Sequence, residues 1–312
     1  MRIGNEQLAP VNGVEIAYQE FGDPDGEPML LVMGLGTQMI AWDEGFCELL
    51  VAAGYRVVRF DNRDVGRSTW LDHFGVPNKA AMLLGLPRGL AYSLDDMADD
   101  LAGLITYLEL ESAHVVGASQ GGMIAQVLGY RRPELVRSLG LIMTGAGKRI
   151  SSLPRLRALG AILAAPPKAR DDYIDAISRT FKVIGSPDYP PDPERLRALI
   201  AAGYDRAHHP VGAARQLHAI TASGDRSRKL RSIRAPTVVV HGSRDPLVRP
   251  AAGRAVAAAI PGAELKVIEG MGHDLPPQLW PQITGHLIAN ARRAEPAEGQ
   301  TGVETVAPGF SR

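Results

Sequence analysis

Short apolar runs alternate with helix-like segments along most of this chain of 312 residues. Six of the runs are mostly apolar at successive positions instead of at every second residue, which is typical of strands buried on both faces of a parallel sheet. They cover residues 29–33, 55–60, 113–117, 138–143, 237–241 and 265–268. Because helices that join parallel strands pack on both faces of the sheet, the sequence predicts an α/β fold.

The first residues predict a different strand pairing. Asn12-Gly13 separates two strand-like segments, and this dipeptide favours a two-residue hairpin because both residues accept a positive φ. The sheet is therefore predicted to begin with antiparallel strands. The clearest helix is predicted over residues 94–108, where apolar residues form one stripe and Ser93, with Asp96 three residues later, provides an N-terminal cap.

A helix-rich stretch with several prolines interrupts the alternation between two of the strand-like runs. We interpret residues 148–229 as a helical cap, inserted into a core that residues 1–147 and 230–293 form together. The last segment, residues 294–312, is poor in apolar residues and rich in Glu, Gly and Pro, which predicts a flexible tail.

One of the predicted turns between a strand and a helix contains a serine. Gly117-Ala118-Ser119-Gln120-Gly121 joins the apolar run 113–117 to a helix-like segment. The pattern G-x-S-x-G also arises by chance, but between a strand and a helix it predicts a strained turn that lifts the serine hydroxyl above the sheet. The glycines leave room for strand and helix to pass closely. Ser119 is therefore the candidate nucleophile.

Two later strand ends supply an acid and a base. In open α/β sheets, functional groups gather beyond the carboxyl ends of the strands. Asp245 follows the run 237–241 and His273 follows the run 265–268, so the order along the chain is Ser, Asp, His. In this interpretation His273 takes the proton of Ser119 during attack on a carbonyl, and Asp245 orients the imidazole.

Other residues compete for these roles, because the chain has eight histidines and many aspartates. His241 is the main competitor as base, although packing or hydrogen bonding is its expected role at the end of a strand. Asp274 directly follows His273 in the sequence. Its carboxylate is therefore too close to reach across the imidazole ring of that histidine. Residues 144–147, at the other strand end where an acid would fit, include no carboxylate. Asp245 therefore remains the candidate acid.

Two backbone amides are candidates for stabilising a negatively charged intermediate. Gln120 follows the serine and opens the predicted helix, and Leu35 lies in the glycine-rich segment 33–37. We predict that their N–H groups form an oxyanion hole, with an ordinary glycine-rich turn as the alternative for residues 33–37. That segment lacks the third glycine and the Lys-Ser/Thr pair of phosphate-binding loops. The cysteine and histidines show no metal-ligand spacing, so no metal is expected.

The overall charge argues against some partners. Lys and Arg total 34 and so do Asp and Glu, so no basic excess favours nucleic acid as a partner. No segment approaches the roughly 20 apolar residues of a membrane span. The single cysteine, Cys47, and an N-terminus without the apolar stretch of a signal peptide lead us to expect a cytoplasmic protein.

The charges are unevenly distributed along the chain. Residues 1–144 contain 10 Lys or Arg and 19 Asp or Glu, whereas residues 145–235 contain 17 and 8. A basic cap that complements an acidic body is one interpretation of this difference. The other is a lid whose field favours anionic substrates.

These motifs together resemble those of the α/β-hydrolase superfamily over residues 14–288. Residues 61–68 look like its D-x-R-x-x-G-x-S loop, and residues 270–273 look like its histidine loop. The resemblance implies an eight-stranded, mostly parallel sheet, a helical cap and a Ser-Asp-His triad without a cofactor. Residues 32–36 and the Asn62-Arg63-Asp64 version of the loop are similar to aclacinomycin methylesterases and related bacterial esterases. Met33 departs from the histidine that many members have, and Gln120 from a frequent methionine.

We therefore expect a serine carboxylesterase that cleaves esters of small to medium, mostly apolar acyl groups, with a small-molecule ester as its partner. A methylesterase acting on a bulky natural-product ester is the alternative within the same class. A non-catalytic ligand receptor on the same fold is the alternative from another class. The oligomeric state has no signal in the sequence.

Overall fold

The computed structural model describes residues 2–147, 154–164 and 167–294. Eight strands form one sheet in the order β1-β2-β4-β3-β5-β6-β7-β8. Strand β2 is antiparallel to β1 and β4, and all the pairings from β4 to β8 are parallel. The predicted mostly parallel, eight-stranded sheet is therefore confirmed.

The strands are β1 (Gln7–Val11), β2 (Val14–Phe21), β3 (Glu27–Val32), β4 (Tyr55–Phe60), β5 (Ala113–Ala118), β6 (Val136–Ile142), β7 (Thr237–Gly242) and β8 (Glu264–Ile268). The helices are α1 (Glu44–Val51), α2 (Lys79–Leu84), α3 (Leu94–Tyr107), α4 (Gln120–Arg131), α5 (Leu156–Leu163), α6 (Arg170–Ile184), α7 (Pro193–Arg206), α8 (Pro210–Ala222), α9 (Ser227–Leu230), α10 (Pro250–Ala259) and α11 (Trp280–Arg292).

Local sequence signals place several of these elements. Asn12 and Gly13 have φ values of 48° and 77°, and they connect β1 to β2 as the predicted hairpin requires. At the start of α3, the Ser93 amide donates to Asp96 Oδ2 at 2.7 Å, and the Asp96 amide donates to Ser93 Oγ at 3.2 Å. This reciprocal pair satisfies two N–H groups at the start of α3, so the predicted N-terminal cap of this helix is confirmed.

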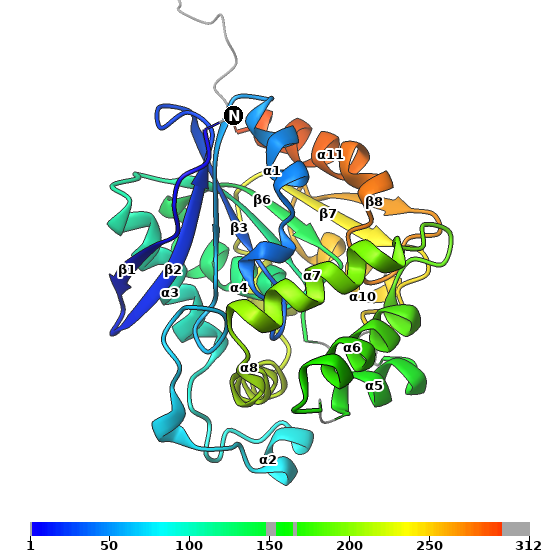
Figure 1. Ribbon diagram of the computed structural model, residues 1–312. Helices are drawn as coiled ribbons and strands as arrows, with labels where there is room; N and C mark the ends of the chain where they lie inside the picture. The colour runs from blue at the N-terminus through cyan, green and yellow to red at the C-terminus, as the bar shows by residue number, and fades with distance from the viewer. Residues whose placement is uncertain (1, 148–153, 165–166, 295–312) are drawn as a thin grey trace, which may run out of the picture.

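The sheet separates two apolar layers. In β3, Leu30 and Val32 pack into a layer with α3, α4 and α10, whereas Met29 and Leu31 pack into a second layer with α1 and α11. Figure 1 shows helices on both sides of the sheet. Because successive strand residues point to opposite faces, a strand with neighbouring apolar residues can contribute to both layers.

One strand differs from its predicted environment. The run 265–268 was expected to be buried on both faces, but β8 lies at the edge of the sheet and Val267 is 40% exposed. The prediction was wrong because short apolar runs do not reveal whether a strand has one neighbour or two.

Helices α5 to α9 lie between β6 and β7 in the chain, and Figure 1 shows α5, α6, α7 and α8 (green) grouped on one side of the molecule. This is the segment predicted as a helical cap. The predicted flexible tail lies outside the described residues, except for Ala294. Among the residues that the structure describes, no helix combines the length and apolar character needed to cross a membrane.

Candidate active site

The serine corner has the conformation that its sequence predicts. Ser119 connects β5 to α4 with φ 53° and ψ −115°, a positive φ that is unusual for a residue with a side chain. A Cβ on Gly121 would lie 2.0 Å from the Val32 carbonyl oxygen, and one on Gly117 would lie 2.3 Å from the Gly121 oxygen. Both glycines are therefore required by close backbone approach at this turn.

The structure brings the three predicted side chains together. His273 Nδ1 lies 2.7 Å from Asp245 Oδ2, and His273 Nε2 lies 3.0 Å from Ser119 Oγ. Asp245 and His273 are buried, and Ser119 is half-buried. With its proton on Nδ1, the imidazole donates to Asp245 and leaves Nε2 to accept from the serine hydroxyl.

Backbone groups fix the carboxylate of Asp245. Its Oδ1 accepts from the amides of Leu247 at 2.9 Å and Val248 at 2.8 Å, which leaves Oδ2 directed at the imidazole. A carboxylate held from both sides keeps the histidine in one orientation, as a general base requires.

The competing histidine is engaged elsewhere. His241 is fully buried, and its Nε2 lies 2.7 Å from the Val248 carbonyl oxygen and 3.6 Å from Asp245 Oδ2. Burial lowers the pKa of His241, which favours the neutral ring despite the nearby Asp245. Its hydrogen bonding agrees with the role expected from the sequence.

The carboxylate of Asp274 is engaged by a serine that is not part of the predicted triad. Its Oδ1 accepts from Ser186 Oγ at 2.5 Å, and Ser186 Oγ in turn accepts from the Gly272 amide at 2.8 Å. Burial raises the pKa of Asp274. The His273 amide also donates to the Ile184 carbonyl at 2.7 Å, so the end of α6 and the residue Ser186 after it hold the histidine loop. Sequence analysis missed Ser186, because no local pattern links it to residues some 88 positions away.

The two predicted amide donors flank Ser119. Gln120 is the first residue of α4 and directly follows Ser119. On the other side, a Cβ on Gly34 would lie 3.2 Å from Ser119 Cβ, so the residue before Leu35 packs against the serine. Within the described residues, neither the Leu35 nor the Gln120 amide nitrogen donates to a protein acceptor. Both N–H groups therefore remain candidates for the predicted oxyanion hole.

The basic charges of the inserted helices meet acidic partners on the body. Arg215 Nε lies 2.7 Å from Asp64 Oδ2, with both side chains almost fully buried. Further pairs join the two parts of the chain: Arg195 with Asp43, Arg206 with Glu6 and Asp61, and Arg215 with Asp72. These contacts favour the interpretation that the uneven charge serves docking of the inserted helices.

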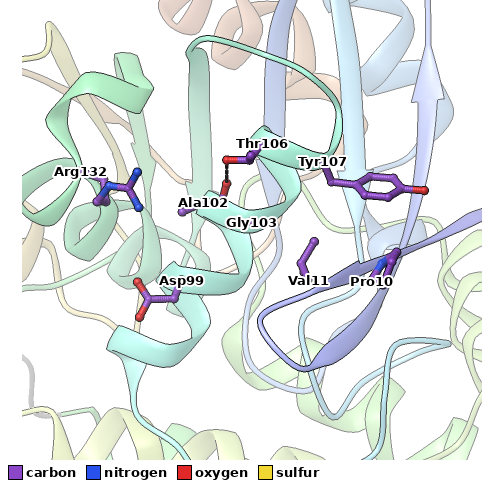
Figure 2. A pocket seen from close by; sticks show the side chains of 8 residues that line it. All are labelled: Pro10, Val11, Asp99, Ala102, Gly103, Thr106, Tyr107 and Arg132. Carbon is purple, nitrogen blue, oxygen red and sulfur yellow. Dashed lines mark hydrogen bonds between the residues drawn. The ribbon is translucent and has the colours of Figure 1, made fainter.

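No three Cys, His, Asp or Glu side chains are grouped as metal ligands in the part of the chain that the structure describes. A separate hollow of about 450 Å³ lies between β1 and α3, with Val11 and Thr106 in its lining (Figure 2). Its lining also includes Arg132, which follows the C-terminus of the 12-residue helix α4. Because Ser119 precedes the N-terminus of that helix, about 18 Å away along its axis, the hollow is separate from the candidate site.

Residues 27–277 match the family described as the alpha/beta hydrolase fold, and the chain belongs to this family. Among its relatives, rhodomycin D methylesterase DnrP of Streptomyces peucetius is 28% identical over 308 residues, covering 90% of this chain and 96% of that protein. The resemblance to bacterial methylesterases predicted from the motifs is confirmed by this relative.

Solved structures share the architecture. The enol-lactonase from Burkholderia xenovorans LB400 has a TM-score of 0.69 at 24% identity, covering 91% of this chain and 99% of that one. Est816, an N-acyl homoserine lactone degrading enzyme, has a TM-score of 0.64 at 27% identity, covering 86% of this chain and 93% of its own. At 24% identity, the likeness to the enol-lactonase shows the fold alone.

Proposed function

We propose that this α/β hydrolase is a serine carboxylesterase that cleaves esters of small to medium, mostly apolar acyl groups through an acyl-enzyme. The observation that carries the proposal is the position of His273, whose two ring nitrogens lie within hydrogen-bond distance of Asp245 and Ser119. A relative named as a methylesterase supports ester hydrolysis over the receptor alternative.

In the first half of the proposed reaction, Ser119 Oγ attacks the ester carbonyl carbon while His273 Nε2 accepts the hydroxyl proton. The carbonyl oxygen becomes an oxyanion, and the Leu35 and Gln120 amides donate to it. Asp245 stabilises the imidazolium. When the intermediate collapses, His273 returns the proton to the departing alcohol, and the acyl group stays on Ser119.

In the second half, a water molecule gives a proton to His273 Nε2 and attacks the acyl carbon. The second tetrahedral intermediate uses the same two amides, and its collapse releases the acid and restores the Ser119 hydroxyl. One base therefore serves both steps.

Apolar side chains near the inserted helices support an apolar substrate. Leu83 and Leu84 of α2 are 64% and 60% exposed, and Leu159 of α5 is also exposed, so core packing does not explain these positions. The Arg155 amide, just before α5, donates to the Pro246 carbonyl at 2.8 Å, which ties that helix to the residue after Asp245. We infer that α5 borders the approach to Ser119.

The test of this function is release of nitrophenol from short acyl esters. Ser119→Ala should lower kcat by roughly 10⁴- to 10⁶-fold with an unchanged melting temperature. A serine-directed phosphonate should label wild-type protein and not this variant. A folded Ser119→Ala protein with wild-type turnover would remove Ser119 from the nucleophile role.

The rhodomycin D methylesterase relatives favour a second candidate, a methylesterase acting on a bulky natural-product ester. Specificity constants for methyl esters of large polycyclic acids, compared with those for aryl acetates, separate the two. Higher constants for the polycyclic methyl esters would select the second candidate. Homoserine lactones belong in the same screen because of the likeness to Est816.

A further inference from the structure

The candidate donor Leu35 lies in a turn whose geometry sets the direction of its N–H. The Thr37 amide donates to the Gly34 carbonyl at 3.2 Å across this turn. The Gly34 carbonyl and the Leu35 N–H belong to the same trans peptide group and point in opposite directions. Because the carbonyl points into the turn, the Leu35 N–H points out of it.

The next peptide group of the turn is held by a residue from the inserted helices. The Gly36 amide donates to Gln216 Oε1 at 2.8 Å. Gly36 has a φ of 61°, and a Cβ there would lie 2.8 Å from Ala213 Cβ, so α8 also packs directly on this glycine. Ala213 and Gln216 are three residues apart and therefore share one face of α8. Both peptide groups next to Leu35 are thus fixed, one within the turn and one by Gln216.

The other end of the Gln216 side chain is also engaged. Its Nε2 donates to the Arg63 carbonyl at 2.8 Å, and the side chain is 0% exposed. The neighbouring Arg215 forms two hydrogen bonds with Asp64, at 2.7 and 2.8 Å, which anchor α8 to the same loop. The amide of Gln216 therefore has an acceptor and a donor partner on two different loops, and its position is set at both ends.

We propose that Gln216 is a positioning residue that holds the turn 34–37 so that the Leu35 amide is aimed at the oxyanion. This inference rests on the proposed function. The Gln120 side chain adds a weaker link, since its Nε2 lies 3.4 Å from the Gln216 carbonyl oxygen. Gln216 touches no reacting atom. It acts through its hydrogen bond with the Gly36 amide. Because this bond fixes the turn 34–37, the Leu35 N–H does not have to reorient each time the oxyanion forms.

The expected effect follows from this indirect role. Loss of a direct oxyanion donor costs about 10²- to 10³-fold in kcat. Gln216→Leu leaves the Leu35 amide in place but frees the turn, so we expect a smaller loss in kcat of about 10- to 100-fold. KM should change by less than about threefold, because the interaction develops in the transition state.

The experiment compares Gln216→Leu with Gln126→Leu. Gln126 is an equally buried amide on α4 whose Nε2 lies 3.4 Å from the Gly145 carbonyl, away from the turn. Both proteins are assayed for kcat and KM, for melting temperature, and for inhibition by an aryl trifluoromethyl ketone. That ketone forms a tetrahedral oxyanion with the serine, so its affinity should fall in Gln216→Leu by the same factor as kcat/KM. Gln126→Leu should keep both values.

A kcat within about twofold of wild type in folded Gln216→Leu, or a kcat loss without a matching loss of ketone affinity, would overturn the assignment. Gln216→Glu provides a second variant if Gln216→Leu does not fold. A glutamate oxygen still accepts from Gly36, so this variant should lose less than tenfold in kcat, and a loss as large as that of an oxyanion donor would contradict the proposal. Phosphonate labelling of wild-type protein but not of Ser119→Ala tests the proposed function independently of Gln216.

Discussion

Replacement of Arg215 by methionine tests how the inserted helices are held on the body. The Arg215 guanidinium donates to both oxygens of Asp64, at 2.7 and 2.8 Å, and the side chains are 1% and 0% exposed. Methionine keeps much of the buried length but removes the charge. Asp64 keeps the hydrogen bond from the Leu71 amide at 2.7 Å, but its buried carboxylate is left without this counter-ion.

Removal of one partner from a buried ion pair costs about 3–5 kcal/mol, because the remaining charge stays desolvated. At about 2 °C for each kcal/mol in a chain of this size, the melting temperature should fall by about 6–10 °C. Arg170→Met is the matched control. Arg170 also binds both oxygens of its partner Asp205, at 2.7 and 2.6 Å, but it is 45% exposed, so the loss should stay below about 1 kcal/mol.

The pH dependence gives a second measurement. Burial alone would raise the pKa of Asp64, but the hydrogen bonds from Arg215 and Leu71 outweigh it and hold the pKa below its ordinary value. The wild-type pair therefore stabilises the fold above that ordinary value, and this contribution disappears as the pH falls through the lowered pKa. In Arg215→Met, burial dominates and raises the pKa, so the penalty exists only at higher pH.

The assay is calorimetric or urea unfolding of the wild type and both variants between pH 7 and about pH 3.5. The deficit of Arg215→Met should be largest near neutral pH and should shrink on acidification. Equal losses in the two variants at pH 7 would refute the reasoning. So would an Arg215→Met deficit that stays constant down to the acid end.

Two further predictions follow from burial and close packing. Gly121→Ala should cost at least about 3 kcal/mol or prevent folding, because its Cβ would lie 2.0 Å from the Val32 oxygen, whereas Gly285→Ala, in an open position of α11, should raise stability by about 0.5–1 kcal/mol. Urea unfolding measures both, and a tolerated alanine at 121 would contradict the tight turn. Burial raises the pKa of the Cys47 thiol to about 12, so native protein should not react with a disulfide reagent at pH 8. Unfolded protein should react with one equivalent, and rapid reaction of the native protein would contradict the burial.

Local chemistry allowed much of the fold and of the candidate site to be predicted. The run 55–60 forms β4 with the same bounds, and Asn12-Gly13 forms the expected hairpin. Both could be predicted because strand burial and a positive φ depend on residues that are adjacent in the sequence. The residues of the candidate triad could also be predicted from the sequence. Its three side chains follow strands of a parallel sheet, and the carboxyl ends of such strands meet at one edge.

The sequence by itself therefore determined the strands, the strained serine corner and the candidates Ser119, Asp245 and His273. Only the tertiary structure decided that β8 lies at the edge and that Gln216 meets Gly36 across 180 residues and Arg63 across 153. The physical reason is the range of the interactions. Turns, caps and apolar periodicity act between residues close in the chain, whereas the partner of a buried amide or guanidinium is selected by how separate helices dock.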